Sequence, residues 1–561
     1  MRKFVSVFFA AALLGAPLAV CAFEGRASAD NLVFAIGPTT YRIAHLEAEG
    51  ASLASADIAK LFDAADPTPV AERLSRLSAA KIFIPEIIGE AKIADVTEKL
   101  VYRDVTLEKV AGARIAVMRA KSLDSTGEHQ NGVRTTVKYG AMTIKGVDLA
   151  QMTRVLHAAR IDEAEAAKPI EDEATIEGIS VVTSTVKGEL SIGRATAAGV
   201  KARALKQPFA QMLEKLPAAG GPPDAATLLD LFSAFQLASL DLRDVALVGE
   251  APPPGKPFAL KLGRIGLTNI ADGKSGEAAL EGFELASGDG GRITIGRIGL
   301  RDVDLRPAIG DGPRRYPHVA RLEISGLDID IPDAKAGEGR RVRFRLGAAA
   351  QDFSDWREGL PTKLDLQIDH ALFDLSANET PVTAQFTALG YKEIDLSGRI
   401  SAQWREKEQQ IVVGPARLDA PTLGGVELSA TLAGARPELF STNPEVAKLA
   451  AAGLAPTLVD VLVRDGEILD RAIASEAKES GDPAPKLRAD LAQGASSALA
   501  AALGGENDKS RRISAAIKAF IETPRRLHIR LSSQKGVGLL DVIARKPAEI
   551  LDNLDVEASA Q

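Results

Sequence analysis

The feature that most constrains this chain is the alternation of apolar and polar residues from Asn31 to about Gly434. A period of two residues places successive side chains on opposite faces of a strand, so this stretch is predicted to form strands with one buried face. Segments with apolar residues three and four apart predict short helices between the strands, at 69–80, 149–160, 208–216 and 224–237.

Two sequence phrases recur within the alternating stretch. Residues 176–179 (Ile-Glu-Gly-Ile) and 190–194 (Leu-Ser-Ile-Gly-Arg) reappear at 280–283 and 293–297, and a third Gly-Arg strand contains Gly263. The phrase Arg-Asp-Val-x-Leu occurs at 103–107, 243–247 and 301–305. The unequal spacings argue against a strict solenoid and for a duplicated hairpin with insertions. Gly193 and Gly296 are expected at a bend or bulge of their strands.

One hairpin can be predicted in register, because residues 327–330 and 341–344 flank a loop that contains Pro332, Asp333, Gly337 and Gly339. We predict that Asp330 lies opposite Arg341 and Asp328 opposite Arg343, which forms a charged face. Ile329 then lies opposite Val342 and Leu327 opposite Phe344, which forms an apolar face.

The period changes after residue 434, where Asn443 and Pro444 form a cap and first turn. Helices are expected at 445–453, 456–475, 487–503, 510–521 and 547–554, and a strand at 527–531. The predicted fold class is therefore α+β and mainly β: an elongated, curved antiparallel sheet of repeated hairpins, with short interrupting helices and a helical C-terminal region. The predicted segments are 1–29 (signal peptide), 30–220 and 221–435 (β-repeat regions) and 436–561, a helical domain that could equally cap the sheet.

The N-terminus has the organisation of a secretory signal peptide: Arg2 and Lys3, an apolar run, and a small-residue site ending at Ala29. Cleavage there removes Cys21, the single cysteine, so the mature chain would have no thiol chemistry. A periplasmic location in a Gram-negative bacterium is expected. The alternatives are an inner-membrane anchor, since 4–23 is long enough to span a bilayer, and a lipoprotein modified at Cys21.

Composition and motifs exclude several function classes. A net charge of -7 gives no basic field for nucleic acid. The six histidines show no metal-ligand spacing, and Gly273-Lys274-Ser275 lacks the preceding glycine of a phosphate-binding loop. No metal, cofactor or catalytic residue is predicted, although His370 beside Asp369 is the least implausible member of a dispersed triad. Asp328, Asp330 and Asp333 lack the pattern of a calcium loop.

The densest basic feature gives two alternatives. The side chains of Tyr316, Arg341, Arg343 and Arg345 could contact anionic lipid headgroups, or they could form a solvated, ion-paired face.

Strings such as 394–400 (Ile-Asp-Leu-Ser-Gly-Arg-Ile) and 425–432 (Gly-Val-Glu-Leu-Ser-Ala-Thr-Leu) resemble the strands of AsmA/TamB-type bacterial envelope proteins, over about 240–434. The resemblance implies a role in lipid movement or envelope homeostasis. We therefore expect a non-enzymatic exported protein that binds or moves lipid along an apolar groove, with lipid or envelope proteins as partners. The alternatives are a periplasmic scaffold with a fully packed core and an exported hydrolase with an unrecognised site.

Overall fold

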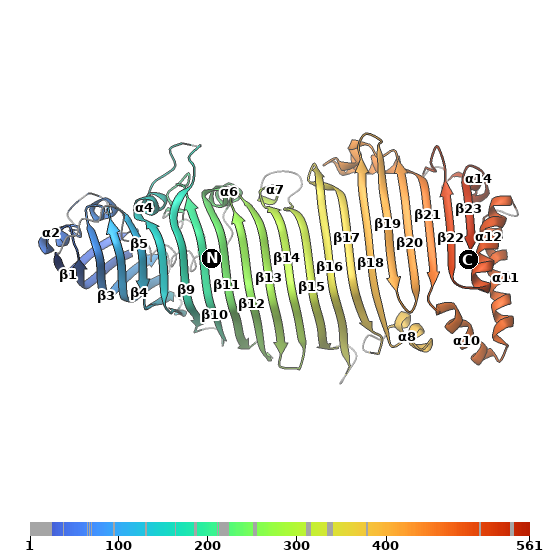
Figure 1. Cartoon of the computed structure of the whole chain (residues 1–561), viewed down its shortest axis with the longest axis horizontal. Helices are drawn as coiled ribbons and strands as arrows, with labels where there is room; N and C mark the ends of the chain where they lie inside the picture. Colours follow the sequence, from blue (N-terminus) through green and yellow to red (C-terminus); the bar gives the residue numbers. More distant parts are fainter. Residues whose placement is uncertain are drawn as a thin grey trace. The chain divides into compact units, whose positions relative to one another are not determined.

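The computed structural model describes residues 25–36, 39–63, 66, 68, 70–93, 96–129, 132–162, 164–184, 188–209, 211–212, 224–250, 255–309, 316–333, 340–376, 380–503, 507–538 and 544–561. The chain forms two compact units. The N-terminal unit comprises Met1–Asp289 and Leu300–His318, and the C-terminal unit comprises Gly290–Gly299 and Val319–Gln561. Figure 1 shows their strands and helices.

The 23 strands of the described residues belong to one antiparallel sheet. Strands account for 57% of the structure, helices are short, and several of them lie in the C-terminal region. The predicted class, α+β and mainly β, is confirmed. Strand β14 (Arg292–Asp304) contributes residues to both units.

In the N-terminal unit most strands pair with their sequence neighbours, but the short strands at 114–120 and 142–148 pair with each other across the two strands between them. The strands are β1 (Arg26–Ile36), β2 (Thr39–Glu49), β3 (Ser78–Ile93), β4 (Val96–Ala111), β5 (Arg114–Ala120), β6 (Ser122–His129), β7 (Arg134–Tyr139), β8 (Met142–Asp148), β9 (Lys168–Thr183), β10 (Gly188–Ala202), β11 (Phe235–Glu250), β12 (Pro257–Ile270) and β13 (Lys274–Ser287). Strands β5 and β6 together pair with β4, and β7 and β8 together pair with β9. Each of these two couples therefore acts as one interrupted strand in a continuous meander.

The N-terminal unit buries the apolar side of β1–β10 in one core. Its helices are α2 (Ser55–Lys60), α3 (Val70–Leu74), α4 (Leu149–His157), α6 (Ala225–Ala234) and α7 (Arg306–Ile309). Ile58 of α2 and Leu149, Met152 and Val155 of α4 pack into this core with side chains from the strands. The Asp148 carboxylate starts α4 by accepting a hydrogen bond from the Gln151 backbone N–H at 2.9 Å. The helices therefore close the apolar side of these strands.

A row of backbone irregularities crosses the repeat strands. In β11 the apolar spacing widens from two residues to three between Leu242 and Val245, where Asp244 adopts a left-handed φ of 54°. Asp244 lies opposite Gly193 of β10, whose Cβ, if present, would lie 3.0 Å from the Asp244 Cβ. The register is the same on both sides of this pair, since Ile192 faces Val245 and Arg194 faces Arg243. The irregularity therefore affects both strands equally and returns the next apolar residues of each to the same face. The repeated Gly and Arg-Asp motifs therefore mark where the strand backbone departs from regular extended geometry.

The same relation recurs along the sheet. In each case a glycine with an ordinary φ lies opposite a residue with a left-handed φ on the following strand. The pairs are Gly193 with Asp244, Gly263 with Gly282, Gly296 with Gly326, and Gly347 with His370. Gly193 and Gly296 lie at such irregularities, but the register of β10 and β11 is unbroken across Gly193, so no bulge forms there, and the expected bend stays a prediction.

The C-terminal unit is also an antiparallel meander. Its strands are β15 (His318–Pro332), β16 (Arg341–Arg357), β17 (Leu360–Asp374), β18 (Glu393–Arg405), β19 (Gln410–Ala420), β20 (Gly424–Ala433), β21 (Ala455–Asp465), β22 (Arg526–Ser532) and β23 (Asp555–Ala560). Its helices are α8 (Pro381–Ala388), η1 (Pro437–Phe440), α9 (Pro444–Ala452), α10 (Ile468–Ser480), α11 (Ala484–Ala502), α12 (Asp508–Glu522) and α14 (Pro547–Asp552).

The predicted hairpin forms, but its register was wrong by two residues. Asp330 faces Arg343, Asp328 faces Arg345, Ile329 faces Phe344 and Leu327 faces Leu346. A shift of two keeps every side chain on its predicted face, so the charged and apolar faces are as expected. Arg341 still reaches Asp330 diagonally and donates a hydrogen bond to its carboxylate.

Several predicted helices need correction. The helix expected at 69–80 stops at Leu74, because β3 begins at Ser78, and the one expected at 224–237 gives way to β11 at Phe235. The first half of the helix expected at 456–475 is β21, and β23 was missed. Most of the helix expected at 208–216 lies outside the described residues. Helices α4, α9, α11, α12 and α14 and strand β22 confirm the other predictions, with small shifts at their ends.

The predicted signal peptide lies mostly outside the described residues, which begin at Gly25. Its last residues, Arg26–Ala29, belong to β1 and pair with β2, and Ala27 and Ala29 are buried in the N-terminal core. Cleavage after Ala29 would remove four paired residues from this strand.

Candidate functional site

The candidate site is one side of the sheet in the C-terminal unit. Alternate residues of strands β15–β20 share this side and, with one exception, are apolar. We call this surface the apolar face; its central members are Ile324 and Leu327 of β15, Phe344, Leu346 and Ala349 of β16, Leu366, Ile368 and Phe373 of β17, Leu396 and Ile400 of β18, Val413 and Leu418 of β19, and Val426 and Leu428 of β20. The exception is Gln351, which lies opposite Leu366.

Strand register aligns these side chains in rows. Ile368 faces Gly398, Gly398 faces Leu418, and Leu418 faces Val426. Directly opposed residues of antiparallel strands project to the same side of a sheet, with Cβ atoms ~5 Å apart. The apolar face is therefore continuous from strand to strand. Six strands spaced by ~4.8 Å give it a width of about 24 Å.

The apolar face is unusually accessible to solvent. Five of its large side chains are exposed: Leu322, Phe373, Ile400, Leu418 and Val426, with Leu418 the most exposed at 52%. Most of its other members are half-buried. Contiguous exposed apolar surface of this kind marks a site of interaction with a ligand, a membrane or another protein.

Helices pack only locally on this side of the sheet, as far as the structure describes it. Phe386 and Leu389 at α8 contact the Leu375–Ile394 cluster at one end of β17 and β18, and Phe440 of η1 packs on Trp404 at the other end of β18. Over β22 and β23 the same apolar side is covered by Ile513, Ala516 and Phe520 of α12. The sheet is therefore closed at its C-terminal edge and open over β15–β20.

The opposite side of the same strands carries ion pairs. Arg321 reaches both Glu323 and Asp352, Arg399 donates to Asp365 at 2.7 Å, and Asp419 bridges Arg417 and Arg464. Exposed pairs of this type hold the strands in register and contribute little stability. The sheet of the C-terminal unit is thus strongly amphipathic.

The three arginines among the predicted headgroup residues lie on the charged side of the sheet, not on the apolar face. Arg341 and Arg343 both pair with Asp330, and Arg343 also approaches Asp374 at 3.7 Å. Arg345 is exposed opposite Asp328. Tyr316 belongs to the N-terminal unit and is 67% exposed. Contact of these residues with anionic headgroups stays a prediction.

Three histidines form surface pairs with carboxylates. His370 is exposed, and its Nδ1 lies 3.0 Å from an Asp395 oxygen, a hydrogen bond that raises the pKa of the imidazole. His45 lies between Asp30 and Glu47, and His528 contacts Asp460 at 2.8 Å. Within the described residues no group of His, Cys, Asp or Glu could hold a metal ion.

No helix of the described ranges is both long and apolar enough to cross a membrane. A model of a family described as "Uncharacterized protein" matches residues 417–561, from the end of β19 through the C-terminal helices. The comparison with curated proteins found no match.

Proposed function

We propose that this protein is an exported envelope protein that binds the acyl chains of lipids on the apolar face of β15–β20. The observation that carries the proposal is the solvent exposure of aligned aliphatic side chains, in particular Leu418 and Val426, on strands whose other side carries ion pairs. An acyl chain needs apolar contact and no hydrogen-bonding partners, which is what this surface offers.

The dimensions of the surface support the same ligand. A bilayer core is ~30 Å thick, so the acyl chains of one leaflet extend ~15 Å. The apolar face is about 24 Å wide across its six strands, which leaves room for a chain laid across several strands. Each buried methylene contributes ~0.8 kcal/mol, so even partial burial of a chain would give measurable affinity.

The test is lipid analysis of the purified full-length protein. Native mass spectrometry and solvent extraction should detect phospholipid or fatty acid bound to the wild-type chain. Val426→Asp should remove most of it, because a carboxylate on the apolar face would have to be desolvated beneath the ligand. A preparation that carries no lipid, and does not bind a fluorescent fatty acid in titration, would refute the proposal.

A matched control separates this effect from general surface change. Val248 of β11 is also an exposed valine, at 55% compared with 43% for Val426, and it lies outside the apolar face. Val248→Asp should leave lipid binding unchanged. Export is tested separately, by cell fractionation and by the mass of the mature N-terminus.

A further inference from the structure

The N-terminal unit contains a cavity of about 320 Å³ whose lining includes four basic side chains and two acidic ones. Arg160 follows α4, Arg203 and Lys206 follow β10, and Arg306 opens α7; Asp230 lies in α6 and Asp272 in the turn between β12 and β13. The C-terminal ends of alternate antiparallel strands meet at one edge of a sheet, which brings these separate segments together. A hydrogen bond from the Leu305 N–H to the Gly273 carbonyl, 2.9 Å long, joins the start of α7 to that turn.

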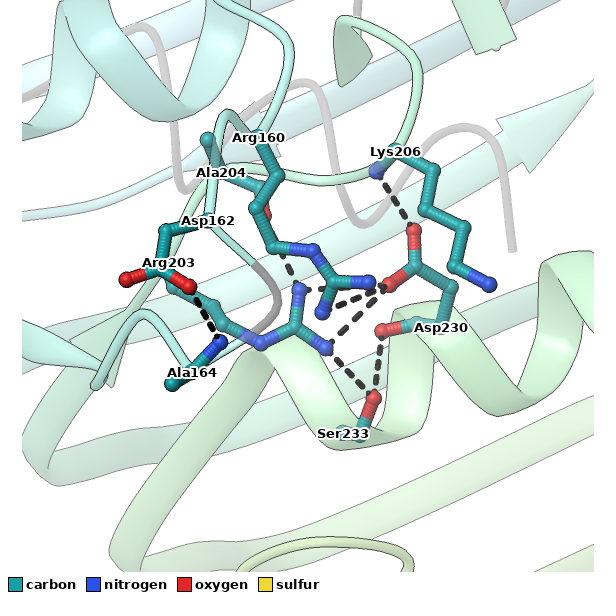
Figure 2. A network of polar contacts seen from close by, with 8 residues as sticks. All are labelled: Arg160, Asp162, Ala164, Arg203, Ala204, Lys206, Asp230 and Ser233. Carbon is teal, nitrogen blue, oxygen red and sulfur yellow. Dashed lines mark hydrogen bonds and ion pairs between the residues drawn. The ribbon is translucent and has the colours of Figure 1, made fainter.

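Arg203 is the anchored cation of this cavity. Figure 2 shows its guanidinium donating to the Ala204 carbonyl at 2.9 Å, to Asp230 at 3.2 Å and to the Ser233 hydroxyl at 2.7 Å. The second Asp230 oxygen accepts a hydrogen bond from the Lys206 backbone N–H at 2.7 Å. Both oxygens of this buried carboxylate are therefore occupied, and its charge balances that of Arg203.

Arg160 is buried to the same extent without equivalent partners. Its side chain is only 10% exposed, and its nearest carboxylate oxygen is Asp230 Oδ1, 3.9 Å from Nη1. That separation is an ion pair without a hydrogen bond. Among the described residues, the guanidinium has no hydrogen-bond acceptor. A guanidinium that lacks acceptors at a cavity wall is the group best suited to bind an oxyanion with two parallel N–H donors.

The remaining lining favours an anion. The lining carries four cations against Asp230 and Asp272. Arg306, half exposed at the mouth, is also paired with Asp304, so the net excess at the cavity is one positive charge. Several donors approaching from different segments suit a tetrahedral group with several free oxygens.

We propose that this cavity binds a phosphate monoester group, held by Arg160 with Lys206 and Arg306. The site is separate from the apolar face and does not depend on acyl-chain binding. The phosphate could belong to a soluble metabolite or to the headgroup of a membrane lipid, and the two sources require different probes.

The first measurement is calorimetric titration of the full chain with inorganic phosphate at low ionic strength. Arg160→Gln should weaken binding about tenfold or more, the effect expected when a charge-assisted hydrogen bond is lost. Arg399→Gln, which removes an ion-paired arginine from the C-terminal unit, is the matched control and should bind phosphate as the wild type does. Arg306→Gln, at the exposed mouth, gives a second test that leaves the buried contacts of Arg203 intact, should Arg160→Gln fail to fold.

The second measurement compares sedimentation with phosphatidylcholine vesicles that contain or lack phosphatidic acid, whose headgroup is a phosphate monoester. Arg160-dependent binding to phosphatidic acid identifies a lipid source, and Arg160-dependent binding to free phosphate alone identifies a soluble one; either supports the site. The proposal is overturned if neither probe distinguishes wild type from Arg160→Gln and Arg306→Gln, or if acetate binds and phosphate does not. Val426→Asp should not alter phosphate binding, so the two proposals can fail independently.

Discussion

Strands β1–β10 of the N-terminal unit and strands β15–β20 of the C-terminal unit share the same alternation of apolar and polar residues, but differ in what lies over their apolar side. In the first region helices and neighbouring strands bury Ile84, Leu107 and Leu123 completely. In the second, equivalent positions such as Leu418 and Val426 face solvent. An alternating pattern therefore specifies a two-faced sheet, and the segments between strands decide whether its apolar face becomes a core or a surface.

The largest expected difference is in the free energy of unfolding lost when a leucine of each region is replaced by alanine. Leu123→Ala leaves a cavity in the N-terminal core and should cost about 2–5 kcal/mol, whereas Leu418→Ala should cost less than about 1 kcal/mol. Urea unfolding followed by far-ultraviolet circular dichroism compares the two variants. Similar losses in both would mean that the apolar face is packed as tightly as the core.

A buried acid in the N-terminal core should make its stability depend on pH. Burial of Glu171, which is 4% exposed, raises its pKa to about 7. The folded state then holds a proton that the unfolded state has lost, so stability should fall as the pH rises from about 4.5 to 7, by at most about 3 kcal/mol, and then level off. Glu171→Gln should flatten this fall. Thermal melts at pH 5 and pH 8 measure it, and an unchanged pH dependence in the variant would contradict the assignment.

The row of backbone irregularities leaves no room for an added methyl group at Gly347. A Cβ at Gly347 would lie 3.0 Å from the Asp369 carbonyl oxygen and 3.2 Å from the His370 Cβ, so Gly347→Ala should destabilise the C-terminal unit by about 1–3 kcal/mol. The two tryptophans, Trp356 and Trp404, both lie in this unit, so fluorescence-detected unfolding reports on it.

Gly494 is the matched control for Gly347. It lies inside helix α11, and a Cβ added there would have no atom of the described residues within 4 Å beyond its own helix backbone and chain neighbours. Gly494→Ala should therefore stabilise by about 0.5–1 kcal/mol. Equal effects of the two substitutions would show that the close approach at Gly347 relaxes without cost.

The smallest effect is expected on the charged side of the sheet. Asp330→Asn weakens the contacts with Arg341 and Arg343, which hold the pKa of Asp330 below its usual value. Because these side chains are largely solvated, the loss should be below about 1 kcal/mol and should shrink in high salt. Denaturation midpoints at low and high ionic strength check this, and a large, salt-independent loss would contradict it.

The alternation was enough to predict the sheet and both faces of the 327–346 hairpin, because face depends only on the parity of each position. The alternation was not enough to predict the strand register of this hairpin, because the register also depends on how many loop residues join the two strands. Strand β21 was mistaken for helix because its apolar run, Leu458–Val463, carries no clear period in an alanine-rich neighbourhood.

The functional surfaces were harder to foresee for different reasons. A groove was expected from resemblance, but exposure on β15–β20 depends on where helices α8, η1 and α12 pack, which no local pattern encodes. The cavity at Arg160 draws residues from positions 160 to 306, and these meet only because alternate strands end at the same edge. In the sequence these arginines and lysines are widely separated and share no motif.

Because each such glycine lies opposite a residue with a left-handed φ on the next strand, the hairpin is the natural unit of duplication in this sheet. In β10–β11 and in β16–β17 the first strand supplies the glycine and the second the left-handed residue, and Gly326 of β15 in turn faces Gly347 of β16. A duplicated hairpin therefore arrives with matching partners for the strands on both sides of it. Sheets of this kind can lengthen by whole hairpins during evolution, while the insertion of one residue into a single strand would disturb both of its neighbours.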